Sequence, residues 1–212
     1  MKTVLCYGDS NTYGYDAIRD GRFLLNVRWP GILQERLGSD WHVIEEGLNH
    51  RTTTVDDPEN EGRNGSVYLL PCLHSHRPLD LVIIMLGSND MKAQYNRTPE
   101  QITQGMADLV KIVRASNCGR GINRAEILLM SPPLAGDQYD YADAMEGITT
   151  KAPLLPYLYR QLAETAQCLF LDASFLKCPY PDGIHLGPNE HLQLGNKVAD
   201  FLLNRETRLI SI

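Results

Sequence analysis

The sequence lacks the features on which secreted, membrane-spanning and nucleic-acid-binding proteins depend. Its five cysteines contain no CxxC pair, and an odd, scattered set of this kind favours a reducing compartment over a disulfide framework. No secretory leader precedes the first apolar segment, and no apolar run is long enough to span a bilayer. No basic block offsets the formal net charge of -6, which argues against a phosphate-backbone partner. We therefore expect a cytoplasmic protein that binds neither membrane nor nucleic acid.

Several common ligand-binding and catalytic motifs are also missing. The chain has no P-loop, and no GxGxxG follows its first apolar run. Thr12 stands where a GxSxG elbow has its second glycine, and residues 9–11 read Asp-Ser-Asn where a phosphoaspartyl phosphatase has Asp-x-Asp. His74 and His76 supply half of a metal-ligand pattern, but no cysteine or carboxylate cluster at ligand spacing accompanies them, so we interpret them as a solvated helix end. We expect neither a metal nor a cofactor.

The composition is that of a single folded domain. Hydrophobic residues make up 43% and charged residues 22% of the 212 residues, which fits a globular protein and argues against disorder. A domain of this length buries about 70% of its unfolded surface and needs no cross-link in order to fold. No repeat, low-complexity tract or linker divides the chain. We expect one domain over residues 1–212.

Short apolar runs alternate with amphipathic segments, apart from two longer loops at 52–66 and 131–150. The strongest run, LDLVIIML at residues 79–86, is continuously hydrophobic, which indicates a strand covered on both faces of a parallel sheet. This order predicts an α/β fold in which five parallel strands lie between two layers of helices. The expected strands are 3–7, 41–45, 79–86, 125–130 and 168–171, and the expected helices are 29–37, 98–113, 154–166 and one from residue 188.

Polar segments follow the predicted strands at the edge where a ligand is expected. In a doubly wound sheet the ligand site lies outside the carboxyl ends of the strands. That rule selects residues 8–12, 47–49, 87–90 and 182–185 without reference to their chemistry. Together these segments contain a hydroxyl nucleophile, oxyanion donors and an Asp/His pair, which an acyl-transfer site requires.

Each of these groups has an expected role in ester cleavage. Ser10 would attack the carbonyl carbon, and His185 would take its proton and return it to the leaving alcohol. Asp182, three residues before His185, would orient the imidazole and stabilise its charged form. The side-chain amide of Asn89 and the backbone N–H groups of Gly47 and Ser10 are the candidate oxyanion donors.

Each residue also has a structural explanation. A serine after a strand is commonly a helix N-cap, so Ser10 alone is weak support for a nucleophile. Asn89 and Asp182 stand in sequences typical of turns. The catalytic interpretation is favoured because all of these residues fall at one edge of the predicted sheet, and convergence of roles is a stronger test than any single motif.

These segments resemble the four sequence blocks of the SGNH (GDSL-type) hydrolase family. The blocks are GDS at residues 8–10, glycine at 47, GxND at 87–90 and DxxH at 182–185, in that order. The longer stretches RWPGILQERL, VIEEGLNHRTT, LDLVIIMLGSND and DGIHL are similar to the arylesterase and acyltransferase branch of the family. The resemblance implies a flavodoxin-like three-layer sandwich and a serine esterase that uses no metal or cofactor.

The resemblance also implies roles and alternatives for the site. It implies that Ser10, Asp182 and His185 form the catalytic triad and that Gly47 and Asn89 join Ser10 in the oxyanion hole. The chain departs from the usual blocks at Asn11 and Tyr13 and at residues 49–50. These departures concern substrate preference more than the triad, and we expect Asn11, Tyr13 and Met91 to contact the substrate.

Relatives in this branch hydrolyse short acyl esters, aryl acetates among them, and some transfer the acyl group to alcohols or peroxide. We therefore expect a serine esterase for a small ester, with water or an alcohol as acceptor. A carbohydrate acetylesterase with the same triad is the second hypothesis, and the 131–150 loop, with Tyr139 and Tyr141, is a candidate part of the substrate site in either enzyme. A non-catalytic binding module is the third hypothesis. Several relatives are oligomers, and the apolar tail at 209–212 is a candidate contact in a homo-oligomer.

Overall fold

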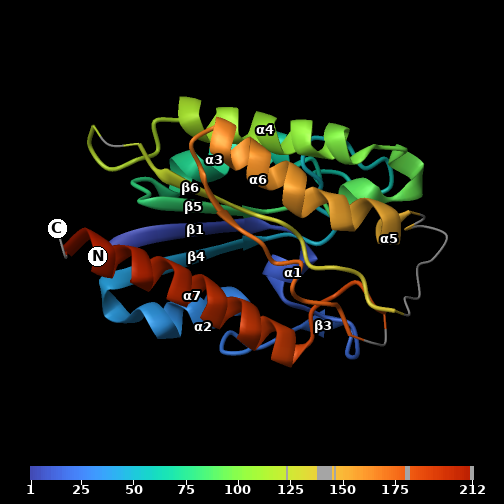
Figure 1. Ribbon diagram of the computed structural model, residues 1–212, viewed down its shortest axis with the longest axis horizontal. Coiled ribbons are helices and arrows are strands. Elements are labelled where there is room, and N and C mark those ends of the chain that lie inside the picture. The colour runs from blue at the N-terminus through green and yellow to red at the C-terminus, as the bar shows by residue number, and fades with distance from the viewer. Residues whose placement is uncertain (123, 138–144, 146, 180–181, 211–212) are drawn as a thin grey trace.

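A parallel sheet forms the middle layer of the molecule (Figure 1). The computed structural model describes residues 1–122, 124–137, 145, 147–179 and 182–210. Within these residues the sheet has five strands in the order β4-β1-β5-β6-β7, and all neighbouring pairs are parallel. The strands are β1 (Lys2–Gly8), β4 (Trp41–Gly47), β5 (Leu81–Met85), β6 (Glu126–Met130) and β7 (Leu169–Leu171).

The chain reverses its direction of travel across the sheet between β1 and β5. From β1 it crosses outward to the edge strand β4, then returns past β1 and adds β5, β6 and β7 on the other side. A crevice forms outside the carboxyl ends of the strands at such a switch point. Figure 1 shows the short helix α1 (Ser10–Tyr13) at this end of the sheet, while both chain termini lie at the opposite end. The fold therefore places the segments that follow β1 and β5 side by side.

Two groups of helices cover the two faces of the sheet (Figure 1). On one face lie α2 (Trp29–Leu37) and α7 (Pro188–Ile210), which pack on each other. On the other lie α3 (Gly65–His76), α4 (Pro99–Ala115) and α6 (Leu155–Thr165). The smaller elements are the hairpin β2 (Tyr15–Asp16) and β3 (Gly21–Arg22), helix α5 (Ile148–Lys151), and 3₁₀ turns at Gly38–Asp40, Asn89–Met91, Ala93–Tyr95 and Ala152–Leu154.

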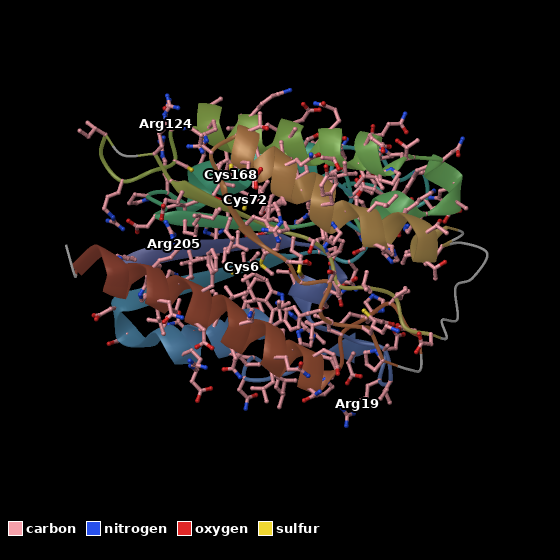
Figure 2. All side chains as sticks on the ribbon, viewed as in Figure 1. Cys6, Arg19, Cys72, Arg124, Cys168 and Arg205 are labelled. Atoms are coloured by element: carbon pink, nitrogen blue, oxygen red, sulfur yellow. The ribbon has the colours of Figure 1, made fainter. Side chains whose placement is uncertain are left out.

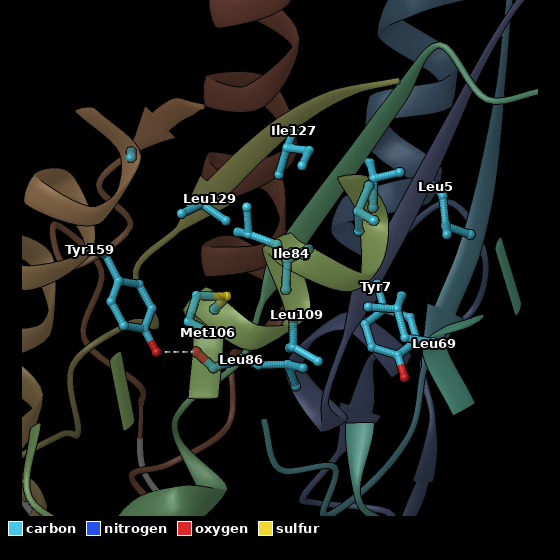
Figure 3. Close-up of a cluster of buried hydrophobic side chains, with 14 of the residues drawn as sticks. Leu5, Tyr7, Leu69, Ile84, Leu86, Met106, Leu109, Ile127, Leu129 and Tyr159 are labelled. Atoms are coloured by element: carbon cyan, nitrogen blue, oxygen red, sulfur yellow. Dashed lines mark hydrogen bonds between the residues drawn. The ribbon is translucent and has the colours of Figure 1, made fainter. Parts of the chain in front are cut away.

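Alternate side chains of the strands build two separate cores. In β1, Val4 and Cys6 belong to the cluster beneath α2 and α7, while Leu5 and Tyr7 belong to the cluster beneath α3, α4 and α6. Figure 3 shows the second cluster, in which the Tyr159 hydroxyl donates a hydrogen bond of 3.0 Å to the Leu86 carbonyl. All four β1 side chains are buried because both faces are covered, and this explains why the strand is hydrophobic throughout.

The predicted fold class is confirmed, and each predicted strand overlaps an observed strand. The sequence pattern does not delimit α3, because Pro71 inside it is a residue that usually ends a helix. It also does not show the β2–β3 hairpin, whose strands have two residues each and therefore carry no periodicity. Among the described residues, no helix is both long and apolar enough to cross a membrane.

Two parts of the sequence-based interpretation lie outside the described residues. In the 131–150 loop, Tyr139 and Tyr141 belong to the segment that the structure does not describe. The last two residues of the apolar tail, Ser211 and Ile212, are also outside it. The predicted roles of this loop and of the tail therefore stay predictions.

Candidate active site

Ser10 is the first residue of helix α1, and one residue, Asp9, separates it from the end of strand β1. The N-cap of this helix is Asp9, whose carboxylate accepts a hydrogen bond of 3.0 Å from the Asn11 N–H. The structure therefore does not support the interpretation of Ser10 as an N-cap. Its hydroxyl is left available for another partner, in a residue that is 8% exposed.

That partner is His185, which links Ser10 to Asp182. The Nε2 atom of His185 lies 2.9 Å from Ser10 Oγ, and its Nδ1 atom lies 2.5 Å from Asp182 Oδ2. The other carboxylate oxygen, Oδ1, accepts backbone N–H groups from Ile184 at 3.0 Å and from His185 at 3.1 Å. Burial opposes ionisation of Asp182, but the hydrogen bonds and charge of His185 and the two N–H groups outweigh it and hold its pKa below the usual value. Asp182 is thus a fixed, ionised acceptor.

Two further residues hold the His185 loop in place. Asn11 donates from Nδ2 to the Ile184 carbonyl at 3.2 Å and accepts the Leu186 N–H at Oδ1 at 2.8 Å. The Tyr15 ring lies against the imidazole, with ring centroids 4.7 Å apart and planes inclined by 56°. Asn11 therefore bridges the loop to α1, and the hairpin that carries Tyr15 covers one side of His185.

Asn89 and Ser10 present N–H donors near the Ser10 hydroxyl. The Asn89 side chain lines the same cavity as Ser10, and its Nδ2 atom donates one hydrogen to the Arg51 carbonyl at 3.1 Å. This bond fixes the orientation of the amide and leaves its second hydrogen for a ligand. The Ser10 N–H belongs to the first turn of α1, where backbone donors have no acceptor within the helix. Both groups are thus placed to receive a developing negative charge.

Gly47, the third expected donor, lies elsewhere. It is the last residue of β4, opposite Gly8 in the ladder, and it borders a hollow other than the one that contains Ser10. A Cβ atom at position 47 would collide with the backbone of Tyr13, so the glycine permits close packing of β4 on α1. The same turn reaches the Ser10 cavity through Asn49 and His50 instead. Among the described residues the backbone N–H of His50 has no backbone acceptor, and its φ of 65° is in the left-handed region.

The cavity in front of Ser10 has a volume of about 280 Å³ and two chemically different sides. Met145 and Ile184 are its aliphatic lining, and Tyr15 adds an aromatic ring. The polar lining beyond the triad and Asn89 consists of Asp20, Asn49, His50 and Lys92. A ligand in this cavity thus meets an apolar surface on one part and hydrogen-bonding groups on another.

Lys92 forms an ion pair on the polar side of the cavity. Lys92 Nζ lies 3.3 Å from Asp57 Oδ2 and 3.3 Å from His50 Nδ1. Burial opposes ionisation of Asp57, but hydrogen bonds from Tyr95, the Glu59 N–H and Lys92 lower its pKa to about 2. Burial, followed by the Lys92 charge, lowers the pKa of His50. At neutral pH the side is therefore polar, with a neutral imidazole beside an ion pair.

The structure does not bring the three expected substrate contacts into the cavity. Met91 is 1% exposed and lies in the core cluster beneath α3 and α4. Tyr13 stacks under the Arg22 guanidinium, 4.3 Å from the ring centroid, and Asn11 is bonded to the His185 loop. None of the three is a lining residue of the cavity as described.

Sequence reasoning missed several of the lining residues. Asn49 and His50 differ from the residues usual in the second sequence block, and that difference was a signal that they lie near the site. Tyr15 and Lys92 stand in no motif, and only the folded chain brings them to the cavity. Among the described residues, no group of three metal-ligating side chains lies in this cavity.

Asp9 is a second buried carboxylate in the site, and its titration gives a stability prediction. Burial raises its pKa to about 6 despite the Asn11 N–H and the nearby charge of His185. Because the folded protein holds this proton to higher pH than the unfolded chain, stability falls as pH rises from about 4 to about 6. Asp9→Asn keeps a good N-cap but does not titrate. We expect its stability relative to the parent protein to improve by about 2 kcal/mol from pH 4 to pH 7.

Urea unfolding of both proteins across this pH range measures the difference. Asp137→Asn is the matched control, because the Asp137 side chain is 87% exposed and forms an ion pair with Lys177 on the surface. A difference between parent and Asp9→Asn that does not change with pH would show that Asp9 is already ionised at pH 4.

The fold and the site together define a class of protein. The site has the arrangement of an α/β serine hydrolase. Hydrogen bonds join a hydroxyl, an imidazole and a carboxylate in succession, and this chain of groups lies at the carboxyl edge of a parallel sheet. Residues 6–191 match the model of the GDSL-like lipase/acylhydrolase family, and the chain belongs to this family. The family resemblance expected from the four sequence blocks is thereby confirmed.

Several solved structures that resemble this chain over nearly its whole length are named as esterases. The inhibitor-bound aryl esterase of M. smegmatis has 41% sequence identity and a TM-score of 0.89, covering 96% of this chain and 99% of its own. Est24, a carbohydrate acetylesterase from Sinorhizobium meliloti, has 38% identity and a TM-score of 0.89, with coverage of 96% and 99%. A carbohydrate acetylesterase family member from the same organism has 42% identity and a TM-score of 0.90, with coverage of 95% and 97%. No curated protein matches the chain. The protein is an SGNH esterase.

Proposed function

We propose that the protein cleaves esters of short acyl groups through a covalent acyl-enzyme on Ser10. The observation that carries this proposal is the Ser10–His185–Asp182 hydrogen-bonded chain, which opens into a cavity of only about 280 Å³. Ser10 Oγ bonds to the carbonyl carbon while its proton passes to His185 Nε2, and the alcohol leaves with that proton. A water, deprotonated by the same nitrogen, then releases the acid and restores the Ser10 hydroxyl.

The tetrahedral intermediate requires donors at its oxyanion. We assign the Ser10 N–H and the Asn89 amide to this role, and the His50 N–H in place of Gly47. Support comes from the cavity, which Ser10, His50 and Asn89 all line, and from the bond to the Arg51 carbonyl that orients the Asn89 amide. The left-handed backbone conformation at His50 breaks the extended course of the chain after β4, so the peptide groups of this turn do not follow the ladder direction of the strand.

Acyl-chain length is the property that tests this proposal most directly. We expect kcat/KM for p-nitrophenyl esters to be highest from acetyl to butyryl and to fall roughly tenfold or more by octanoyl, because a cavity of about 280 Å³ has too little room for longer chains. The assay compares the parent protein with Ser10→Ala as the blank and adds an alcohol in parallel samples. Activity that rises with chain length, or that Ser10→Ala retains, would contradict the proposal.

The added alcohol tests a finer proposal, transfer of the acyl group to an alcohol or to peroxide. The similarity to the acyltransferase branch supports it, and so does the apolar lining by Met145 and Ile184, since a dry acceptor channel favours alcohol over water. Formation of the new ester in these samples would support transfer. Acid as the sole product would restrict the enzyme to hydrolysis.

A carbohydrate acetylesterase is the second candidate function. Asp20, Asn49, His50 and Lys92 give one side of the cavity the hydrogen-bonding groups that sugar hydroxyls need. The two Sinorhizobium meliloti structures add support from similar chains. The ratio of kcat/KM for an acetylated sugar to that for phenyl acetate separates the two functions. A ratio above one favours the sugar ester.

We also infer a cytoplasmic location and a homo-oligomeric state. The first is supported by five free cysteines, of which four are buried and none is paired. The second is supported by exposed apolar side chains on α3, where Val67, Tyr68 and Leu70 are 68%, 40% and 42% exposed. Light scattering of the purified protein tests the oligomeric state.

A further inference from the structure

A thiol, an imidazole and a carboxylate meet between helix α3 and the end of strand β4, outside the active-site cavity. Cys72 and His76 are four residues apart in α3 and therefore lie on one face of the helix. Glu46 reaches them from the penultimate position of β4. One ligand atom from each residue lies within 4.8 Å of the other two, and His76 Nε2 is 2.8 Å from Glu46 Oε1.

This grouping corrects the sequence-based view of the two histidines. His76 does not face open solvent, since it bonds to Glu46, and the ring of His74 points to the Ser116 carbonyl at 3.2 Å. The His74-x-His76 pattern has no cysteine or carboxylate close by in the sequence. The structure supplies the cysteine as Cys72, one helical turn before His76, and the carboxylate as Glu46, from the distant strand β4. His74 has no part in the group.

The separations suit a single small cation. Bonds from zinc to sulfur, nitrogen or oxygen are about 2.0 to 2.3 Å, so two ligands of a tetrahedral ion lie about 3.3 to 3.8 Å apart. Three atoms within 4.8 Å of one another need only small side-chain shifts to reach that geometry. Cys72 is fully buried, whereas the side chains of His76 and Glu46 are 30% and 19% exposed. The group is therefore anchored inside and open to solvent on one side, which leaves room for ion entry and a water ligand.

The charge of the group also suits a divalent cation. Once a metal has displaced the Cys72 proton, the thiolate and the Glu46 carboxylate carry two negative charges, and they outweigh the one positive charge of the neighbouring Arg51. That guanidinium is engaged elsewhere, since it lies 4.1 Å from the Tyr7 ring centroid and donates to the carbonyls of Gly8 and Glu46. A mixed sulfur, nitrogen and oxygen donor set favours borderline-soft ions of the zinc type over calcium or magnesium.

We propose that Glu46, Cys72 and His76 form a binding site for a zinc-type divalent cation, with water as the fourth ligand. Figure 2 marks Cys72 inside the molecule, away from the surface positions of Arg19 and Arg124. Without a cation, burial and the Glu46 charge raise the pKa of the Cys72 thiol to about 12. On binding, the metal–sulfur bond replaces the S–H bond and the proton passes to the buffer. The ion would join α3 to the edge strand β4.

Cobalt(II) is the spectroscopic probe for this site. Protein freed of metal with a chelator is titrated with cobalt(II), and we expect a near-ultraviolet thiolate-to-cobalt band that saturates at one ion per chain and disappears when zinc is added. Cys72→Ser should abolish the band, and His76→Gln should weaken cobalt binding roughly tenfold or more. His74→Gln, on the same helix, is the matched control and should bind as the parent protein does.

Further measurements separate this site from the triad and from failure to fold. Zinc should raise the melting temperature of the parent protein and of His185→Ala, but not of Cys72→Ser. His76 lies at the half-exposed end of α3, so His76→Gln keeps the test valid even where substitution of buried Cys72 prevents folding. The proposal is overturned if the parent protein shows no thiolate band, if both site variants bind cobalt normally, or if His185→Ala loses the metal.

Discussion

Replacing Ser10 with alanine is expected to lower kcat for ester hydrolysis by roughly 10⁵-fold or more, the scale of loss when the nucleophile of a serine hydrolase is removed. The reason is that Ser10 Oγ supplies the bond to the acyl carbon, and no other hydroxyl is bonded to His185 Nε2 among the described contacts. Water at that position would leave only the oxyanion donors and substrate binding to assist the reaction. Steady-state kinetics with p-nitrophenyl acetate measures the loss.

A double variant shows whether the loss reflects a shared mechanism. Since Ser10 and His185 act on the same proton, Ser10→Ala combined with His185→Ala should be hardly worse than Ser10→Ala alone. The Ser10→Ala protein should also unfold at a temperature close to that of the parent protein, because only one oxygen atom is removed. Two results would place the nucleophile elsewhere. One is a Ser10→Ala protein whose kcat is within about a hundredfold of the parent value, and the other is a double variant whose loss in kcat equals the product of the two single losses.

The second large effect is expected for Asp182→Asn, which should lower kcat by roughly 10⁴-fold through the wrong imidazole tautomer. Asp182 Oδ1 accepts two backbone N–H groups, so the amide oxygen of asparagine must take that position. Its NH₂ group then faces His185 Nδ1, which has to accept a hydrogen bond instead of donating one. The imidazole proton moves to Nε2, the atom that must receive the Ser10 proton.

The measurement is kcat across pH, with an unchanged unfolding temperature as the sign that the loop is intact. Asp137→Asn makes the same chemical change at a surface ion pair with Lys177 and serves as the control, with kcat near that of the parent protein. A loss of less than about tenfold in Asp182→Asn would mean that His185 is oriented by other contacts, such as the Tyr15 ring.

Local sequence pattern was sufficient for the sheet and for the proposed triad. Each strand is an apolar run of a few residues, and the rule for doubly wound sheets brings residues 10, 89 and 182–185 to one edge. The structure places residues 10 and 89 side by side because β1 and β5 are neighbours at the switch point, and the loop that follows β7 brings His185 to Ser10. The order of the strands along the chain and the residue types that follow them were enough to predict the sheet and the proposed triad.

Contacts between distant segments were beyond the sequence pattern. Gly47 and His50 are three residues apart in one turn, and only the folded backbone shows which of them reaches the Ser10 cavity. Asn11 has the polarity of a substrate contact, but its hydrogen-bonding groups are used by a loop more than 170 residues away, at sequence separations of 173 and 175. Tyr15 reaches His185 through a hairpin too short to show any periodicity.

The bridge from Asn11 to the His185 loop has a consequence for when activity can appear. The proposed nucleophile, Ser10, is made near the beginning of the chain and its proposed base, His185, near the end, and two Asn11 hydrogen bonds join the segments at 3.2 and 2.8 Å. During synthesis, therefore, the ribosome releases the serine long before the histidine exists, and a chain arrested before residue 185 has no base. Ester cleavage can thus serve as a readout of complete translation, and two fragments cut in a surface loop would recover it only by reassociating.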